Sequence, residues 1–280
     1  AEVVCVPSTL CARVPDGVPF EDAAFTPLAA IALQGIRLSS PTLGEVFAVQ
    51  GLGVLGLLAA QILKANGCRV LAFDVNPSRV ALAQSLGIEA HALSNSATCT
   101  DIAQTLTNGR GVDAALIAAS SKSDSIIHQA ASMCRRHGRI VLLGAVGLDL
   151  DRRDFYEKEL SFQVSCSYGP GRYEPQYEGH GLDFPPGYVR WTAQRNFEAV
   201  LALFANGAIA TAPLVSNRVE FLNAATSYQS LLMSEESLGI AFTYEATALT
   251  ADRLISAAKP HATTSPHNNS RKIDRPRVGV

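Results

Sequence analysis

The chain has 280 residues, of which 48% are hydrophobic and 17% charged, so it can bury a large core and is not a disordered polymer. Its 23 basic and 25 acidic side chains give a net charge of −2, which favours neither nucleic acid nor an anionic membrane as a partner. Six cysteines are scattered without a Cys-x-x-Cys pair, and we therefore expect reduced thiols rather than disulfides or a zinc knuckle.

The start of the chain shows no basic segment followed by an apolar run, so we expect no secretory signal and a cytoplasmic location. Residues 46–63 are uncharged and reach the length of a membrane span. Gln50, Gln61 and three glycines interrupt this segment, which favours a strand, a turn and a buried helix instead.

Strands and helices alternate through the middle of the sequence, after a first strand expected at 1–7. Apolar runs predict strands at 45–50, 69–73, 112–118 and 139–143. Capping residues and glycines delimit the helices between them, which are predicted at 55–66, 77–87, 100–107 and 123–136. Continuous apolar strands alternating with helices predict a doubly wound parallel α/β sheet of the Rossmann type.

The pattern changes after residue 159. We predict, in chain order, a strand at 160–167, an aromatic and Pro/Gly-rich loop at 170–190, helices at 191–206 and 220–233, and a strand at 238–244. The polar, Pro/Ser/Asn-rich segment 259–276 has the composition of a linker.

The sequence Gly51-Leu52-Gly53-Val54-Leu55-Gly56 links the predicted strand 45–50 to the helix that follows. In a dinucleotide-binding fingerprint the first glycine permits a tight turn and the second lets the backbone approach a pyrophosphate. The third allows close packing of helix and strand, and the helix N-terminus offers free amides to the phosphates.

Asp74 follows the last glycine by eighteen residues and ends the next strand. At this position a carboxylate can accept hydrogen bonds from the adenosine ribose hydroxyls and repel a 2′-phosphate, which favours NAD over NADP. Two alternatives stay open: the glycines serve packing alone, or the turn binds another nucleotide-like ligand such as S-adenosylmethionine.

Four passages together resemble the medium-chain dehydrogenase/reductase superfamily, the alcohol dehydrogenase-like enzymes, over residues 1–245. They are AEVVCVPSTLCARVPDGVPFEDAAF at the start, residues 45–87 around the glycine turn, GRIVLLGAVG at 138–147, and NRVEFLNAATSYQSLLMSEESLGIAFTYE at 217–245. The resemblance implies a dinucleotide-binding domain at 27–159. Residues 1–26 (a remnant) and 160–245 would form an incomplete, mostly β substrate lobe.

The resemblance also implies site residues. Arg79 matches a basic residue beside the ribose, Val54 and Leu55 match the backbone contact to pyrophosphate, and Ala119 and Gly144 match strand ends that line the nicotinamide pocket. With the glycine turn and the ribose acid, the predicted cofactor-binding residues are Gly51, Gly53, Val54, Leu55, Gly56, Asp74, Arg79, Ala119 and Gly144.

Residues 165–200, SCSYGPGRYEPQYEGHGLDFPPGYVRWTAQRNFEAV, resemble a bacterial two-module branch of the superfamily. In that branch the dehydrogenase is fused to a module of the glucose–fructose oxidoreductase and inositol dehydrogenase family. Residues 275–280, RPRVGV, look like the start of that second module, so we expect 246–280 to hold a linker and its beginning, and the chain to be a fragment. The branch implies polysaccharide biosynthesis and a sugar-derived substrate.

A zinc ligand of zinc-dependent family members would fall near Thr26, and threonine is a poor zinc ligand. The part of the family that supplies the other ligands is absent from this sequence. We therefore predict no catalytic zinc, and no other metal.

The loop around residues 168–195 concentrates aromatic and arginine side chains, which suit sugar or carboxylate recognition by stacking and paired hydrogen bonds. The alternative is a surface loop that packs on a neighbouring lobe or subunit. The candidate catalytic residues are Thr26, Tyr168, Arg172 and Tyr173, none of which is assigned a chemical step.

The sequence thus predicts an oxidoreductase that moves a hydride between NAD(H) and an alcohol or carbonyl, as a homo-oligomer. A non-catalytic NAD-binding module of a larger protein is the second hypothesis. A methyltransferase is the third, disfavoured because no acidic residue stands just before the glycine turn.

Overall fold

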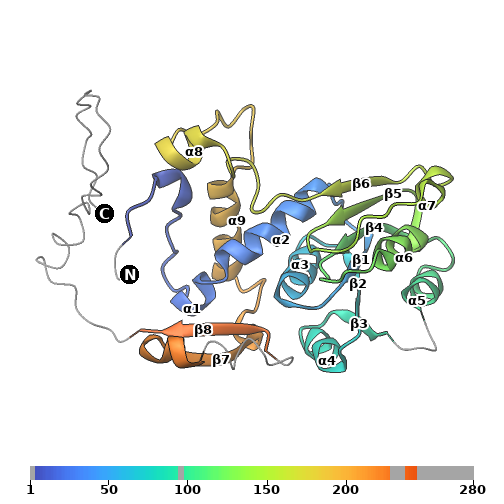
Figure 1. Cartoon of the computed structure of the whole chain (residues 1–280), viewed down its shortest axis with the longest axis horizontal. Coiled ribbons are helices and arrows are strands. Elements are labelled where there is room, and N and C mark those ends of the chain that lie inside the picture. Colours follow the sequence, from blue (N-terminus) through green and yellow to red (C-terminus); the bar gives the residue numbers. More distant parts are fainter. Residues whose placement is uncertain (1–3, 94–97, 228–236, 245–280) are drawn as a thin grey trace, which may run out of the picture. The chain divides into compact units, whose positions relative to one another are not determined.

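The computed structural model describes residues 4–93, 98–227 and 237–244, and Val6–Tyr244 form one compact unit (Figure 1). The predicted linker and second module at 246–280 lie outside the described residues. Among the helices of the described part, none has both the length and the apolar character that a membrane crossing requires.

Six parallel strands form the main sheet in the order β3-β2-β1-β4-β5-β6. The strands are β1 Val46–Gln50, β2 Arg69–Asp74, β3 Glu89–Ala92, β4 Val112–Ile117, β5 Cys134–Leu142 and β6 Ser161–Val164. The predicted parallel Rossmann-type sheet is confirmed, and β3 is an additional edge strand. Since all strands run the same way, the segments that follow them leave from one carboxyl edge.

The helices are α1 Phe20–Ala23, α2 Thr26–Leu38, α3 Val54–Ala65, α4 Pro77–Ser85, α5 Cys99–Leu106, α6 Ser125–Met133, α7 Arg152–Tyr156, α8 Pro175–His180 and α9 Ala193–Ala205. Local chemistry fixes several starts. Asn76 caps α4 by accepting from the Ser78 amide at 2.9 Å, with Pro77 at the first helical position. Thr98 and Asp101 form a reciprocal capping box at α5.

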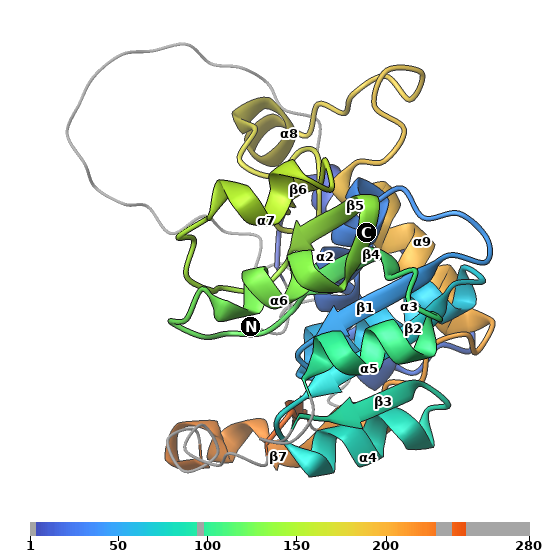
Figure 2. The same ribbon diagram turned by 90° about the vertical axis from the view of Figure 1, so that its right-hand side faces the viewer.

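Helices cover both faces of the sheet, as Figure 2 shows from a second direction. Successive strand residues point to opposite faces, so Phe47 and Val49 of β1 join the core under α2, α3, α4 and α9. Ala48, between them, joins the core under α5 and α6. Burial on both faces explains why the strands are continuously apolar and leaves the sheet's carboxyl edge as the place for a ligand.

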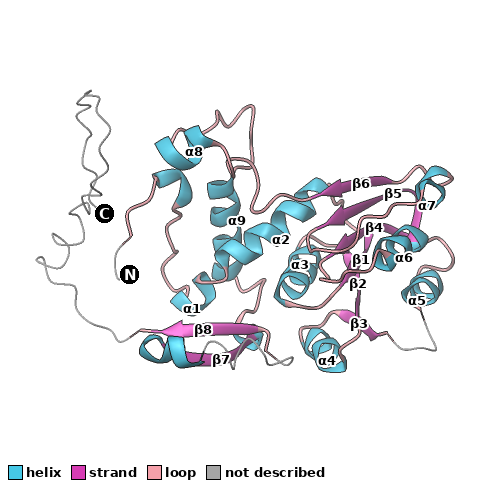
Figure 3. Ribbon diagram, viewed as in Figure 1, coloured by secondary structure: helices cyan, strands magenta, loops and turns pink. Residues whose placement is uncertain are grey.

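Outside this sheet the chain forms the two-stranded parallel sheet of β7 Val215–Glu220 and β8 Gly239–Thr243 (Figure 3). Single turns of 3₁₀-helix occur at Ser8–Leu10, Ala212–Leu214 and Phe221–Asn223. An ion pair of 2.5 Å joins Arg218 of β7 to Glu21 of α1. Strand β8 confirms the prediction at 238–244.

The predicted helix 123–136 is wrong at its C-terminal end, because α6 stops at Met133 and residues 134–138 belong to β5. Cys134 pairs with Val112 of β4, and this sheet pairing replaces a further helical turn. The Lys158 ammonium closes the helix end by donating to the carbonyls of Ala131, Ser132 and Cys134 at 2.8–2.9 Å.

Two other predictions also need correction. Residues 4–7, the described part of the expected strand 1–7, have no regular secondary structure. The expected loop 170–190 contains α8, which spans Pro175–His180 and is capped by Gly181 in a left-handed conformation (φ +67°). Of the expected helix 220–233, residues 221–227 are helical and 228–233 lie outside the described residues.

Candidate functional site

The glycine turn leaves β1 at the carboxyl edge, and packing explains two of its glycines. Gly51 has φ +94° and donates to the Phe73 carbonyl at 2.8 Å. A Cβ on Gly51 would lie 2.7 Å from the Ala119 amide nitrogen, and one on Gly56 would lie 1.8 Å from the Gly51 carbonyl oxygen. Both positions exclude a side chain whether or not a ligand binds.

Gly53 is different, because nothing in the protein requires a glycine there. Its φ of −68° and ψ of −176° suit any residue. A Cβ at Gly53 would meet no protein atom within 4 Å. The missing side chain therefore leaves open space in front of the backbone, as a closely approaching pyrophosphate needs.

The N-terminus of α3 adds hydrogen-bond donors beside this open space. No side chain caps α3, in contrast to α4 and α5, and the amides of Val54 and Leu55 have no acceptor among the described residues. Free amides and the positive end of the helix dipole favour an anion. Gly53, Val54 and Leu55 thus fit a dinucleotide pyrophosphate.

Asp74 lies at the carboxyl end of β2 and is only 6% exposed. One carboxylate oxygen accepts from the Leu52 amide at 2.6 Å and the other from the Asn76 amide at 2.8 Å. The carboxylate therefore fastens the glycine turn to β2, a role that the sequence analysis missed. Each oxygen keeps a second acceptor site, so the predicted ribose contact stays compatible with this geometry.

Arg79 lies in the first turns of α4, after Asn76, and makes no hydrogen bond or ion pair with the described residues. Its guanidinium therefore has no protein partner in the described part of the chain. The ribose contact of Arg79 stays a prediction.

The ends of β4 and β5 bring Ala119 and Gly144 together. The Gly144 amide donates to the Ile117 carbonyl at 2.9 Å, and the Ala145 amide donates to the Ala119 carbonyl at 3.2 Å. A Cβ on Gly144 would lie 2.1 Å from the Ala119 carbonyl oxygen. Since the glycine turn also contacts Ala119, the predicted pyrophosphate and nicotinamide regions adjoin along one edge of the sheet.

Thr26 is the first residue of α2 and is 9% exposed, and its buried Oγ1 has no hydrogen-bond partner among the described residues. No group of three or more His, Cys, Asp or Glu side chains within residues 4–93, 98–227 and 237–244 is arranged to hold a metal ion. The residues of this part do not fit a zinc site, and the absence of catalytic zinc in the protein stays a prediction.

The segment after β6 brings three predicted residues together. The Arg172 guanidinium carbon lies 4.1 Å from the ring centroid of Tyr173 and 5.9 Å from that of Tyr168. Arg172 also donates to Glu178 of α8 at 2.5 Å, and this hydrogen bond raises the pKa of the arginine. Tyr168 packs on Phe197 of α9, with ring centroids 5.1 Å apart.

Other members of the aromatic and arginine set serve packing. The guanidinium carbons of Arg37 and Arg190 lie 3.4 and 3.8 Å from the ring centroid of Trp191, which fixes the end of the loop to α2. Burial and the nearby Arg190 charge lower the pKa of Arg37 to about 10. Arg195 of α9 pairs with Asp183 of the loop. These contacts support the alternative that the part of the loop around Arg190 and Trp191 packs on neighbouring elements.

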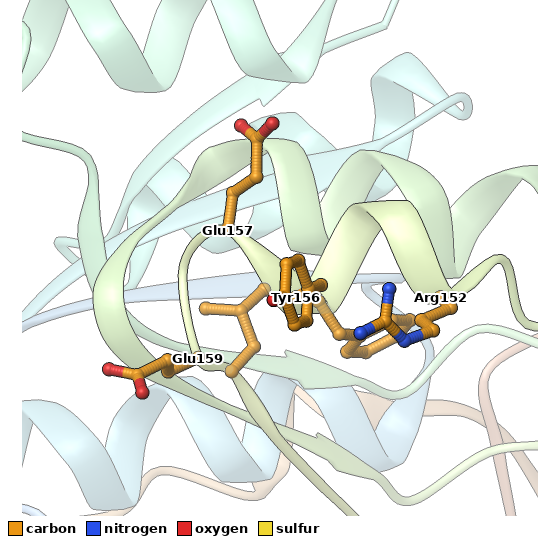
Figure 4. A pocket seen from close by; sticks show the side chains of 6 residues that line it. Arg152, Tyr156, Glu157 and Glu159 are labelled. Carbon is orange, nitrogen blue, oxygen red and sulfur yellow. The ribbon is translucent and has the colours of Figure 1, made fainter.

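A separate cavity is lined by residues of α7 and of the turn before β6 (Figure 4). This turn leads into the amino end of β6, whereas the glycine turn lies at the carboxyl edge of the parallel sheet, so the cavity and the glycine turn are at opposite edges. Arg152 stacks on Tyr156 there at 3.8 Å. The carboxylates of Glu157 and Glu159 point away from each other in Figure 4 and do not converge on a ligand. No predicted site residue lines this cavity.

Sequence reasoning also missed Glu178 and Asn196. The amide of Asn196 donates to the Tyr168 carbonyl at 2.9 Å and its oxygen accepts from Arg37 at 2.8 Å. Pro175 signals the start of α8 and so places Glu178 in its first turn, which was a usable signal. Asn196 shows no sequence signal, because its partners are more than 20 residues away.

The fold is a parallel α/β sheet of the Rossmann type, and its glycine turn leaves space and free amides that a dinucleotide would fit. Residues 54–178 match the family model of the zinc-binding dehydrogenases. L-threonine 3-dehydrogenase of Rhizobium rhizogenes is 29% identical over 193 residues, which cover 66% of this chain and 54% of that protein. The matched segment is therefore similar to the zinc-binding, medium-chain dehydrogenases, and the chain spans about half the length of the curated relatives it matches.

Solved structures show the same alcohol dehydrogenase-like fold. 2R,3R-butanediol dehydrogenase of Bacillus subtilis superposes with a TM-score of 0.67 at 22% identity, over 82% of this chain and 60% of that one. An alcohol dehydrogenase of E. coli CFT073 in complex with NADH gives 0.65 at 22% identity, over 83% and 62%.

Proposed function

We propose that this chain binds NAD(H) along the carboxyl edge of its six-stranded sheet and serves an oxidoreductase that acts on an alcohol or carbonyl compound. The open space at Gly53 carries the proposal, because packing accounts for the other two glycines of the turn but not for this one. The family match supports a nicotinamide cofactor, and structural relatives have been solved with NADH and with NADP, so the preference for NAD(H) rests on Asp74.

The chain's own residues would bind and orient the cofactor. The amides of Val54 and Leu55 would hold the pyrophosphate, Asp74 the adenosine ribose, and the strand ends at Ala119 and Gly144 the nicotinamide. The carboxylate of Asp74 opposes a 2′-phosphate, which favours NAD(H) over NADP(H). When bound, the nicotinamide supplies the hydride chemistry, and the protein positions it.

The experiment is a fluorescence titration of NADH and NADPH against the full chain and its Gly53→Val variant. The Cβ of the valine meets no protein atom within 4 Å and the backbone conformation is permitted, so we expect a folded chain with at most a small N-cap cost in stability, and NADH binding weakened at least ~10-fold, about 1.4 kcal/mol. Gly187→Val is the matched control, because its Cβ also meets nothing within 4 Å, and it should bind NADH like the unmodified chain. Equal NADH binding by Gly53→Val, or a folded chain that binds neither nucleotide, would refute the proposal.

A second candidate is a non-catalytic NAD-binding module, which is favoured by Thr26 at the position where zinc-dependent members carry a metal ligand, because threonine is a poor zinc ligand. Absorbance at 340 nm, followed with a panel of sugar-derived alcohols and NAD, distinguishes the two. Reduction of NAD supports the enzyme, whereas NADH binding without turnover by the full-length protein supports the binding module. We also propose that the protein lacks a catalytic zinc, forms a homo-oligomer and is fused to a second oxidoreductase module. Its proposed role is in polysaccharide biosynthesis.

A further inference from the structure

The segment that follows β6 begins at the same carboxyl edge as the glycine turn, because all six strands are parallel. Strand β6 neighbours β5, whose end carries Gly144, and adjacent strands lie about 4.8 Å apart. A ligand that extends past Gly144 along this edge therefore meets the segment 165–173 next.

This segment is held firmly on α2, α8 and α9. Gly169 and Gly171 have φ values of +106° and +104°. A Cβ on Gly169 would lie 2.7 Å from the Gln34 side-chain oxygen, and one on Gly171 would lie 2.6 Å from the Tyr177 ring. Since Asn196 also holds the Tyr168 carbonyl, the backbone before Arg172 has little freedom.

Tyr173 is the unexpected residue of this segment. Its φ is +66°, in the left-handed region that a bulky side chain rarely adopts, and the residue is 67% exposed. A residue with so much exposed surface gains little from packing to offset the unfavourable backbone. Strain of this kind is concentrated at ligand-binding positions, where the surrounding structure enforces it.

Arg172 and Glu178 supply polar groups beside the exposed ring. One terminal nitrogen of Arg172 donates to one oxygen of Glu178 at 2.5 Å. The other guanidinium nitrogens of Arg172 and the second oxygen of Glu178 have no hydrogen-bond partner among the described residues. The pair is neutral overall and offers donors and an acceptor together, an arrangement that suits hydroxyl groups better than an anion.

We propose that Tyr173 and the Arg172–Glu178 pair form a subsite for a neutral polyhydroxylated molecule, a sugar or a polyol, as the substrate of the oxidoreductase. The exposed face of Tyr173 would stack on the C–H face of the sugar, while the polar pair binds neighbouring hydroxyls. This inference deepens the proposed function and rests on it.

The test measures sugar binding directly, without turnover. Saturation-transfer difference NMR on the full chain with saturating NADH uses glucose, galactose, N-acetylglucosamine and myo-inositol as probes, with glucose 6-phosphate as an anionic comparison. We expect at least one neutral probe to bind, and Arg172→Gln and Tyr173→Gly to weaken that binding at least ~10-fold. Tyr188→Ala is the control, because this tyrosine of the same loop is 91% exposed and makes no ring contact in the described residues.

Tyr173→Gly separates a binding role from a structural one. Glycine adopts φ +66° without strain, so the variant should melt at the same or a higher temperature while it loses the sugar. A lower melting temperature with unchanged sugar binding would assign Tyr173 to structure and overturn the inference, as would the absence of binding by every neutral probe. NADH binding, titrated in parallel, fails only if the proposed function itself is wrong.

Discussion

Asp74→Ala tests whether the carboxylate at the end of β2 holds the glycine turn as well as the cofactor. The substitution removes the acceptor of the Leu52 and Asn76 amides, which now donate at 2.6 and 2.8 Å. Leu52 is fully buried, so its amide would be left without a partner and shielded from water.

The expected loss of stability follows from these two bonds. An unsatisfied buried donor costs about 1–3 kcal/mol. The Asn76 amide lies in a half-buried residue and can turn to water, so its loss adds about 1 kcal/mol. A total of about 2–4 kcal/mol corresponds to a melting temperature lowered by roughly 4–16 °C for a chain of this size.

Urea denaturation, followed by circular dichroism with and without NADH, measures both roles of Asp74. Asp74→Asn is the comparison, because its amide oxygen can still accept from Leu52, so its stability should lie between those of Asp74→Ala and the unmodified chain. If Asp74→Ala unfolds at the same urea concentration as the unmodified chain, the two bonds do not hold the turn. Loss of NADH binding without any loss of stability would then assign Asp74 to the cofactor alone.

Two further predictions concern titratable side chains. His128 of α6 pairs with Asp154 of α7, whose carboxylate raises the histidine pKa above 6.5. The pair should therefore stabilise the fold fully below pH 6.5 and less as the pH rises through the folded pKa. The measurement is the urea midpoint as a function of pH for the unmodified chain and for His128→Gln. If the difference between the two midpoints does not change with pH, the expectation is contradicted. Burial raises the pKa of Cys134 to about 12, whereas Cys166 is exposed. Of these two thiols, Ellman's reagent should therefore modify only Cys166 in the native state and both Cys134 and Cys166 in urea, as mass spectrometry of the modified peptides would show.

The sequence predicted the parallel sheet because each central strand is buried on both faces, which leaves a continuous apolar run. It could not place the end of α6. Met133 and Cys134 suit a helix as well as a strand, and the pairing of Cys134 with Val112, a partner distant in sequence, decides between them. Such a tertiary contact cannot be predicted from the residue types of the segment alone.

The candidate site shows a similar division. The spacing of the glycines and Asp74 indicated the turn, and the turn lies where a parallel sheet binds its ligands. The second role of Asp74 was not predictable, since it depends on the direction of two backbone amides. The backbone of Tyr173 was equally hidden, because nothing about a tyrosine in sequence signals a φ of +66°.

The three glycines of the turn therefore provide unequal support for a ligand. Gly51 and Gly56 are required by packing within the protein, because a Cβ there would lie 2.7 Å from the Ala119 amide nitrogen and 1.8 Å from the Gly51 carbonyl oxygen, and the same fold would keep them without any nucleotide. Gly53 has no such contact, so selection for folding alone would allow many residues there. A glycine motif indicates binding chiefly through the position that packing leaves free, and here that position faces the uncapped amides of α3.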